Sequence, residues 1–184
     1  MKSFFMMDNS NNHGKETMLG YQISWLMRLA ARKDVENRKL HEISRFTLLQ
    51  LLDMKDCRDV DIVEVNVSRE WHYIDVFAKC KVRRNNQIEE HLIIIENKIY
   101  TNLADGQLNK NSNTFHSYYP NFPVERTHFW LISCNEDSWE KQEQECANAE
   151  SDWRLLWFYD VIGGKLDNPI GNDIFDEFWV NEWY

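Results

Sequence analysis

The sequence has few cysteines, a deficit of basic residues and no long apolar run. Its four cysteines are scattered without a C-x-x-C pair, which argues against zinc or iron–sulfur sites built on closely spaced ligands. We expect these thiols to be reduced, as in a cytoplasmic protein. No apolar stretch approaches the roughly 18 residues of a membrane helix, so we expect no membrane span.

The deficit of basic residues limits how the chain can meet a nucleic acid. Asp and Glu number 30 against 21 Lys and Arg, a formal net charge of −9. A field of this sign repels polyanions, so nucleic-acid binding needs a local basic face or a metal ion. The sequence contains one dense basic cluster. It either contacts a phosphate backbone or forms a solvated turn that discourages pairing of an edge strand with another chain. Its residues are Lys79, Lys81, Arg83 and Arg84.

The apolar content is sufficient for one sizeable core. The chain has 184 residues, of which 43% are hydrophobic and 14% aromatic, and this fits a single domain over residues 1–184. The opening MKSFFMM is shorter than the apolar region of a signal peptide, and polar residues follow it. We therefore expect residues 1–14 to be flexible, with no export and a cytoplasmic location.

Periodicity and residue type predict helices first and strands next. Residues 15–53 are rich in helix formers and predict two helices, the second with Asp34 as its N-cap. Residues 60–100 contain three β-branched and aromatic runs, which predict three strands. A short connection at 68–70 is expected to join the first two strands, and a longer polar turn at 83–90 the second and third.

The rest of the chain is expected to add a helix, a strand and then peripheral elements. The resulting α-β-β-β-α-β order predicts an α/β fold with a mixed central sheet flanked by helices. The core with the chemistry is expected over 60–133, and peripheral elements over 136–184. The expected elements are a helix at 105–118, a strand at 127–134, a helix at 138–150, a strand or strand-to-helix turn at 153–162 and an amphipathic helix at 172–184.

Charged residues end the third predicted strand. Glu96 and Lys98 are two residues apart, so their side chains leave the same face of the sheet. They follow three isoleucines typical of a strand buried on both faces, where charges are costly unless they serve a site. Asp75 lies in an equally apolar strand, and pairing of the two strands would bring its carboxylate near Glu96. Two carboxylates, together with carbonyl and water oxygens, form the kind of site that Mg²⁺ prefers. The alternative is that Glu96 and Lys98 form only a surface ion pair at the end of a strand.

Three motifs taken together resemble the PD-(D/E)XK nuclease superfamily. They are I-D-V at 74–76, I-I-I-E-N-K-I at 93–99 and Q-L at 107–108. The resemblance implies a restriction-endonuclease-like core and a nuclease that cuts DNA, with RNA as the alternative substrate, through a water activated by Mg²⁺, with Mn²⁺ as a substitute. By the same resemblance, Asp75 and Glu96 are the metal carboxylates.

The resemblance also assigns the neighbouring residues. Lys98 corresponds to the catalytic lysine, Gln107 to the helix residue that orients the site, and the backbone carbonyl of Asn97 to a further metal ligand. Members of the superfamily often carry an acid on the helix before the sheet, and we assign this role to Glu42, which shares a helical stripe with apolar residues. A solvated or capping acid is the alternative for Glu42, and Glu16 or Glu36 can fill the role instead.

Two function hypotheses follow. The first is an active nuclease, and the second is an inactive module of the same fold that binds or assembles, which the acidic charge and small size favour. A divalent ion between Asp75 and Glu96 would support the enzyme, and collapse onto an ion pair of Lys98 would favour the module. The aromatic segment at 175–184 predicts a homodimer interface or, alternatively, completes the chain's own core. Arg69 and Glu70, just before Asp75, either approach phosphate or form a plain turn.

Overall fold

The fold is built around one mixed five-stranded sheet. The computed structural model describes residues 12–55, 57, 59–99 and 101–181. The strand order is β1-β2-β3-β4-β5, with the first three strands antiparallel and β4 and β5 parallel to β3. The strands are β1 (Asp61–Trp71), β2 (Ile74–Arg84), β3 (Gln87–Lys98), β4 (Thr127–Ser133) and β5 (Trp153–Trp157).

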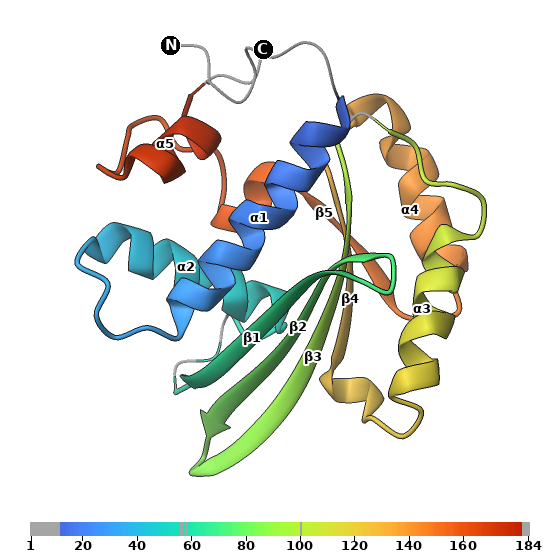
Figure 1. The fold of residues 1–184 in the computed structure, drawn as a ribbon, viewed down its shortest axis with the longest axis horizontal. Coiled ribbons are helices and arrows are strands. Elements are labelled where there is room, and N and C mark those ends of the chain that lie inside the picture. Colours follow the sequence, from blue (N-terminus) through green and yellow to red (C-terminus); the bar gives the residue numbers. More distant parts are fainter. Residues whose placement is uncertain (1–11, 56, 58, 100, 182–184) are drawn as a thin grey trace.

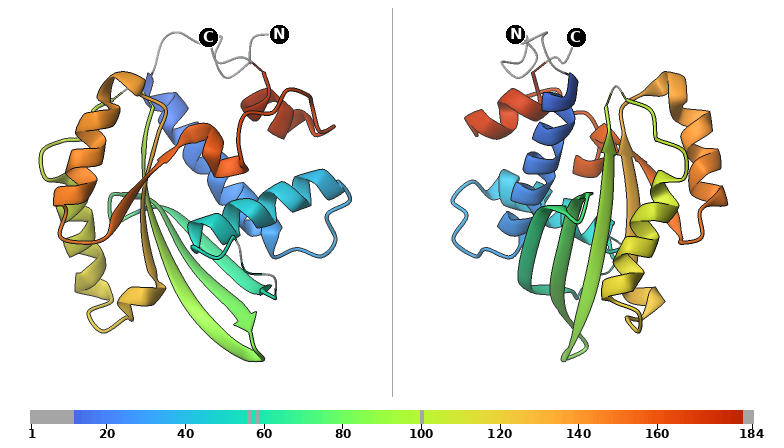
Figure 2. Two further views of the ribbon diagram at one scale, coloured as in Figure 1. Left: turned by 180° about the vertical axis from the view of Figure 1, so that it is seen from behind. Right: turned by 45° about the vertical axis from the view of Figure 1, so that its right-hand side comes forward.

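Helices cover both faces of this sheet (Figures 1 and 2). Helices α1, α2 and α5 lie on one face, and α3 and α4 lie on the other. Each face has its own apolar core: Ile93 and Ile95 of β3 belong to the α1–α2 side, and Ile94 belongs to the α3 side. The α/β fold predicted from the sequence is confirmed, and burial on both faces accounts for the uninterrupted apolar run of β3. The helices are α1 (Asn12–Ala30), α2 (Arg38–Leu51), α3 (Gln107–Tyr118), α4 (Trp139–Asn148) and α5 (Asp173–Trp179), with 3-10 turns η2 (Val124–Arg126), η3 (Glu136–Ser138) and η4 (Phe158–Ile162).

Both hairpin turns differ from the sequence expectation. The connection expected at 68–70 lies inside β1, and the turn is formed instead by His72 and Tyr73. The long polar turn expected at 83–90 contracts to Asn85 and Asn86, whose φ angles of 50° and 61° suit a two-residue turn. Strand pairing therefore continues through polar residues that the composition alone had marked as loop.

The N-terminus of α2 also differs from the expectation. Asn37, rather than Asp34, is the N-cap, and its side chain accepts a hydrogen bond of 3.0 Å from the backbone N–H of Leu40. Asp34 instead pairs with Arg32 at 2.6 Å. Either residue type can cap a helix, so the loop conformation before α2 decides which one does so.

The terminal aromatic residues complete the chain's own core. Phe175, Phe178 and Trp179 are at most 1% exposed, and the ring of Trp179 stacks on Phe158 with centroids 4.7 Å apart. These rings are not available as an interface, and a homodimer remains a prediction that needs another surface. Residues 182–184 lie outside the described part. Among the described helices, none has the length and apolar character needed to cross a membrane.

Candidate metal centre

Three donors hold the carboxylate of Glu96 at the end of β3. Lys98 Nζ donates to Glu96 Oε1 at 2.7 Å, and Gln107 Nε2 donates to the same oxygen at 2.6 Å. Asn111 Nδ2 donates to Oε2 at 2.9 Å. Glu96 is 1% exposed and Lys98 is 8% exposed. Two amides of α3 and one ammonium group of β3 therefore fix a buried carboxylate beneath the helix.

Asp75 brings a second carboxylate from β2. Val76 pairs with Ile95, so continuing the antiparallel register places Asp75 opposite Glu96. Asp75 Oδ2 accepts a hydrogen bond of 2.8 Å from the backbone N–H of Asn97. The backbone of Asn97 thus borders the site, while the role of its carbonyl as a metal ligand remains a prediction.

Burial disfavours the ionised form of both carboxylates. It raises the pKa of Asp75, although the N–H of Asn97 and the charge of Lys98 oppose the change. Burial and then the charge of Asp75 raise the pKa of Glu96 to about 7. Burial also works against the charge of Lys98, but the neighbouring carboxylates, Glu96 foremost, leave its pKa above the usual value. Lys98, together with Arg69 at Asp75, leaves the pKa of the buried Glu96 and the half-buried Asp75 raised, so the site favours additional positive charge.

The helix acid beside the site is Glu16 of α1. Its Oε1 accepts hydrogen bonds from the backbone N–H of Ile99 at 3.1 Å and from the hydroxyl of Thr101 at 2.6 Å. Its charge also acts on Asp75 and Lys98. Glu16 was one of the alternatives open at the level of sequence, and the structure brings it to the end of β3.

Glu42 is not brought to this site. It lies exposed on α2 and forms an i, i+4 ion pair with Arg38 at 3.1 Å. Sequence reasoning also passed over Asn111, which stands one helical turn after Gln107 and reaches the other oxygen of Glu96. That i, i+4 spacing was the signal that could have identified Asn111, because residues four apart share one face of a helix.

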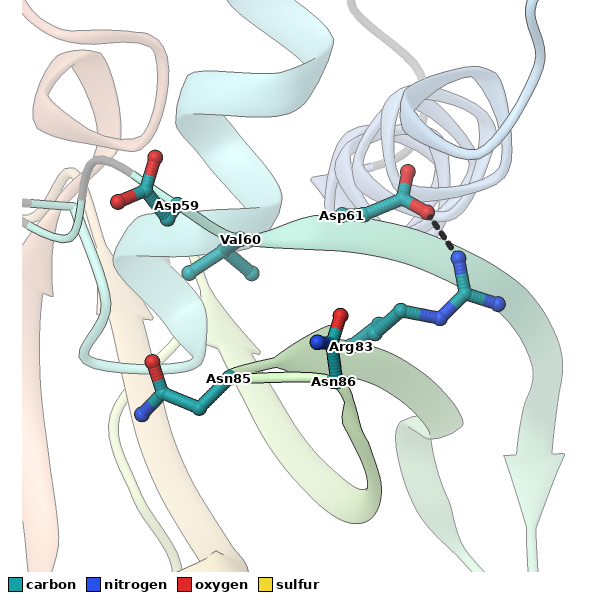
Figure 3. A pocket seen from close by; sticks show the side chains of 6 residues that line it. All are labelled: Asp59, Val60, Asp61, Arg83, Asn85 and Asn86. Carbon is teal, nitrogen blue, oxygen red and sulfur yellow. Dashed lines mark hydrogen bonds and ion pairs between the residues drawn. The ribbon is translucent and has the colours of Figure 1, made fainter.

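Two of the four basic residues in the cluster on β2 pair with acids of β1. Lys81 pairs with Glu64 at 2.7 Å, and Arg83 pairs with Asp61 at 2.9 Å. Figure 3 shows the Arg83 pair beside a pocket of about 410 Å³ at the start of β1. This pocket lies at the opposite end of β2 from Asp75, so the solvated alternative fits the cluster better than a phosphate track beside the site.

A family model described as the PD-(D/E)XK nuclease superfamily matches residues 3–169. The chain belongs to the PD-(D/E)XK nuclease superfamily. No curated protein and no solved structure matches it. The superfamily supports a nuclease-type function with nucleic-acid binding, and its members generally use divalent metals.

The donor set fits such a metal. Within the described ranges, no group of three or more His, Cys, Asp or Glu side chains is arranged to hold an ion. Mg²⁺, however, is commonly held by only one or two carboxylates, with water and other oxygens completing its shell. Asp75 and Glu96 supply two oxygen ligands of this kind in a setting that favours positive charge. This superfamily site thus fits a hard divalent cation.

Proposed function

We propose that this chain is a metal-dependent nuclease that hydrolyses phosphodiester bonds of DNA, with RNA as the alternative substrate. The observation that carries the proposal is the meeting of Asp75 and Glu96 on adjacent strands, beside the ammonium group of Lys98, with more negative charge than Lys98 offsets. Two neighbouring carboxylates shielded from water destabilise each other, and a divalent ion would relieve this repulsion. A cytoplasmic location belongs to the same proposal.

Each residue has a distinct proposed role. Asp75, Glu96 and the carbonyl of Asn97 would hold Mg²⁺, for which Mn²⁺ could substitute. When bound, the ion lowers the pKa of a water molecule and polarises a phosphoryl oxygen. Lys98, whose pKa lies above its usual value, keeps a proton and offers positive charge to the phosphate. Gln107 orients the carboxylate of Glu96 through its hydrogen bond to Oε1.

The second candidate function is an inactive module of the same fold. The ion pair between Lys98 and Glu96 at 2.7 Å is the observation that favours it, because this pair occupies a carboxylate oxygen that a metal would need. The net charge of −9 points the same way. The charges of Lys98 and Arg69 offset the charge of Asp75 only in part, because its pKa stays raised, and for this reason we favour the enzyme.

A nuclease assay separates the two functions. Single-stranded, double-stranded and branched DNA, together with RNA, are incubated with Mg²⁺, with Mn²⁺ or with EDTA. We expect cleavage with either metal and none with EDTA. Asp75→Asn should abolish cleavage, and Glu42→Gln, which changes an exposed acid outside the site, should leave it unchanged. Cleavage by Asp75→Asn at the wild-type rate would place the site elsewhere, and no cleavage by the wild type on any substrate would favour the module.

A further inference from the structure

The turn between β1 and β2 exposes an aromatic ring beside the metal centre. Tyr73 is 86% exposed and stands two residues before Asp75. Lys110 Nζ, from α3, lies 5.7 Å from the centre of the Tyr73 ring. Lys110 directly precedes Asn111, which donates to Glu96. The ring and the lysine therefore come from two separate elements, each of which continues into a residue of the site, Asp75 after Tyr73 and Asn111 after Lys110.

This turn has an unfavourable backbone conformation. Trp71 pairs with Ile74 across it, which leaves a two-residue loop of His72 and Tyr73. Both residues have positive φ, 50° and 72°, a region that such turns normally fill with Gly, Asn or Asp. Backbone strain of this kind concentrates at binding and catalytic sites, where a particular side chain has to be presented.

Contacts between aromatic side chains hold the turn in place. Trp71 stacks on Phe77 with centroids 4.4 Å apart, and His72 stacks on Tyr118 of α3 at 4.3 Å. The hydroxyl of Tyr118 and Nδ1 of His72 are 3.2 Å apart. The two residues before Tyr73 are thus anchored to the sheet and to α3, whereas Tyr73 itself projects into solvent.

We propose that Tyr73 stacks on an unpaired nucleobase of the substrate while Lys110 contacts a nearby phosphate, so that single strands and unpaired ends are the substrate class. This inference rests on the proposed nuclease function. A chain with a net charge of −9 gains little from long-range attraction to a polyanion. Base–aromatic stacking provides affinity that does not depend on net charge, and it tolerates every base. In an intact duplex both faces of an internal base are covered by its neighbours, so only unpaired or terminal bases can stack on the ring.

The test compares Tyr73→Ala and Tyr73→Phe with a matched control, Ile88→Ala. Ile88 is 57% exposed near the β2–β3 turn, at the other end of β2. The dissociation constant for single-stranded and blunt duplex DNA is measured by fluorescence anisotropy in Ca²⁺, and KM and kcat are measured in Mg²⁺. We expect Tyr73→Ala to raise the single-strand dissociation constant and KM about tenfold with little change in kcat. Tyr73→Phe, which keeps the ring, and Ile88→Ala should behave like the wild type.

Abasic single strands test the partner of the ring directly. Loss of the bases should weaken binding by the wild type and remove the difference between the wild type and Tyr73→Ala. If the wild type cleaves single strands and Tyr73→Ala equals it on every substrate, the inference is overturned and the proposed function stands. Binding that depends on Tyr73 without any cleavage supports the inference and rejects the nuclease. A wild type that binds no nucleic acid overturns both.

Discussion

Lys98 and Gln107 donate to the same oxygen of Glu96, at 2.7 and 2.6 Å. Asn111 donates to the other oxygen, so three buried or half-buried donors depend on one carboxylate. Hydrogen bonds to an ionised acceptor are stronger than those between neutral groups, and a buried donor without an acceptor is costly. Glu96 therefore stabilises the β3–α3 contact as well as belonging to the candidate metal centre.

Removing this carboxylate should destabilise the fold. We expect Glu96→Ala to lower the free energy of unfolding by about 2 kcal/mol, because the ammonium group of Lys98 and two side-chain amides lose their hydrogen-bond acceptor. Glu96→Gln keeps an accepting oxygen and should lose less. Urea denaturation in EDTA measures both variants. Equal stability of Glu96→Ala and the wild type would show that these hydrogen bonds contribute no net stability.

Asp75 should behave in the opposite way. Burial, and to a lesser extent the charge of Glu16, raises its pKa, so without metal Asp75→Asn should raise the free energy of unfolding by about 1 kcal/mol. The Asn oxygen can still accept the N–H of Asn97. Adding Mg²⁺ should increase the melting temperature of the wild type and not of Asp75→Asn, because a ligand that binds the native state stabilises it. Equal shifts in both proteins would place the ion at another site.

The central motif was predictable because its signals are local. Three isoleucines followed by Glu96 and Lys98 indicate a strand buried on both faces that ends in charged groups, and β3 has this form. The proximity of Asp75 follows from pairing of neighbouring strands, a frequent arrangement for consecutive strands. The helix expected at 105–118 is α3 (Gln107–Tyr118), with Gly106 at its N-cap position.

The helix acid and the first hairpin were not predictable in the same way. A helical stripe shows that one face of α2 is apolar, but which helix end reaches β3 depends on long-range packing, which brings Glu16 there and leaves Glu42 exposed. The turn at His72 and Tyr73 lacks the Gly, Asn and Asp residues that mark two-residue turns. Its aromatic contacts, made across the chain with α3, stabilise a turn that the local sequence disfavours.

This disfavoured turn provides a prediction that separates stability from binding. We expect Tyr73→Gly to raise the free energy of unfolding by about 1 kcal/mol, because glycine adopts the φ of 72° without strain and the lost ring is exposed. The same variant should bind single-stranded DNA as weakly as Tyr73→Ala. Thermal melting and fluorescence anisotropy measure the two effects. Lower stability of Tyr73→Gly would show that the ring itself contributes to the fold.

A buried histidine pair lies at the other end of the parallel strands. His128 Nε2 is 3.0 Å from Nδ1 of His91, and Arg154 Nη2 is 3.4 Å from Nδ1 of His128. Arginine can only donate, so Nδ1 of His128 accepts and its Nε2 carries the proton. Protonating Nδ1 would direct an N–H at the guanidinium group. Burial, followed by the charges of His91 and Arg154, lowers the pKa of His128 to about 3.

The sign of the resulting pH dependence follows from this depressed pKa. In the unfolded chain the pKa of His128 is about 6.5, so below this pH the unfolded state binds a proton that the folded state does not. The contribution of His128 to stability is fully present above pH 6.5 and is lost, at about 1.4 kcal/mol per pH unit, as the pH falls toward 3. Between pH 7 and pH 5, we expect the unfolding free energy of the wild type to fall by about 2 kcal/mol more than that of His128→Gln. The control is His116→Gln, which changes an exposed histidine and should follow the wild type. If the unfolding free energies of the wild type and His128→Gln change in parallel with pH, His128 ionises as easily in the fold as in water.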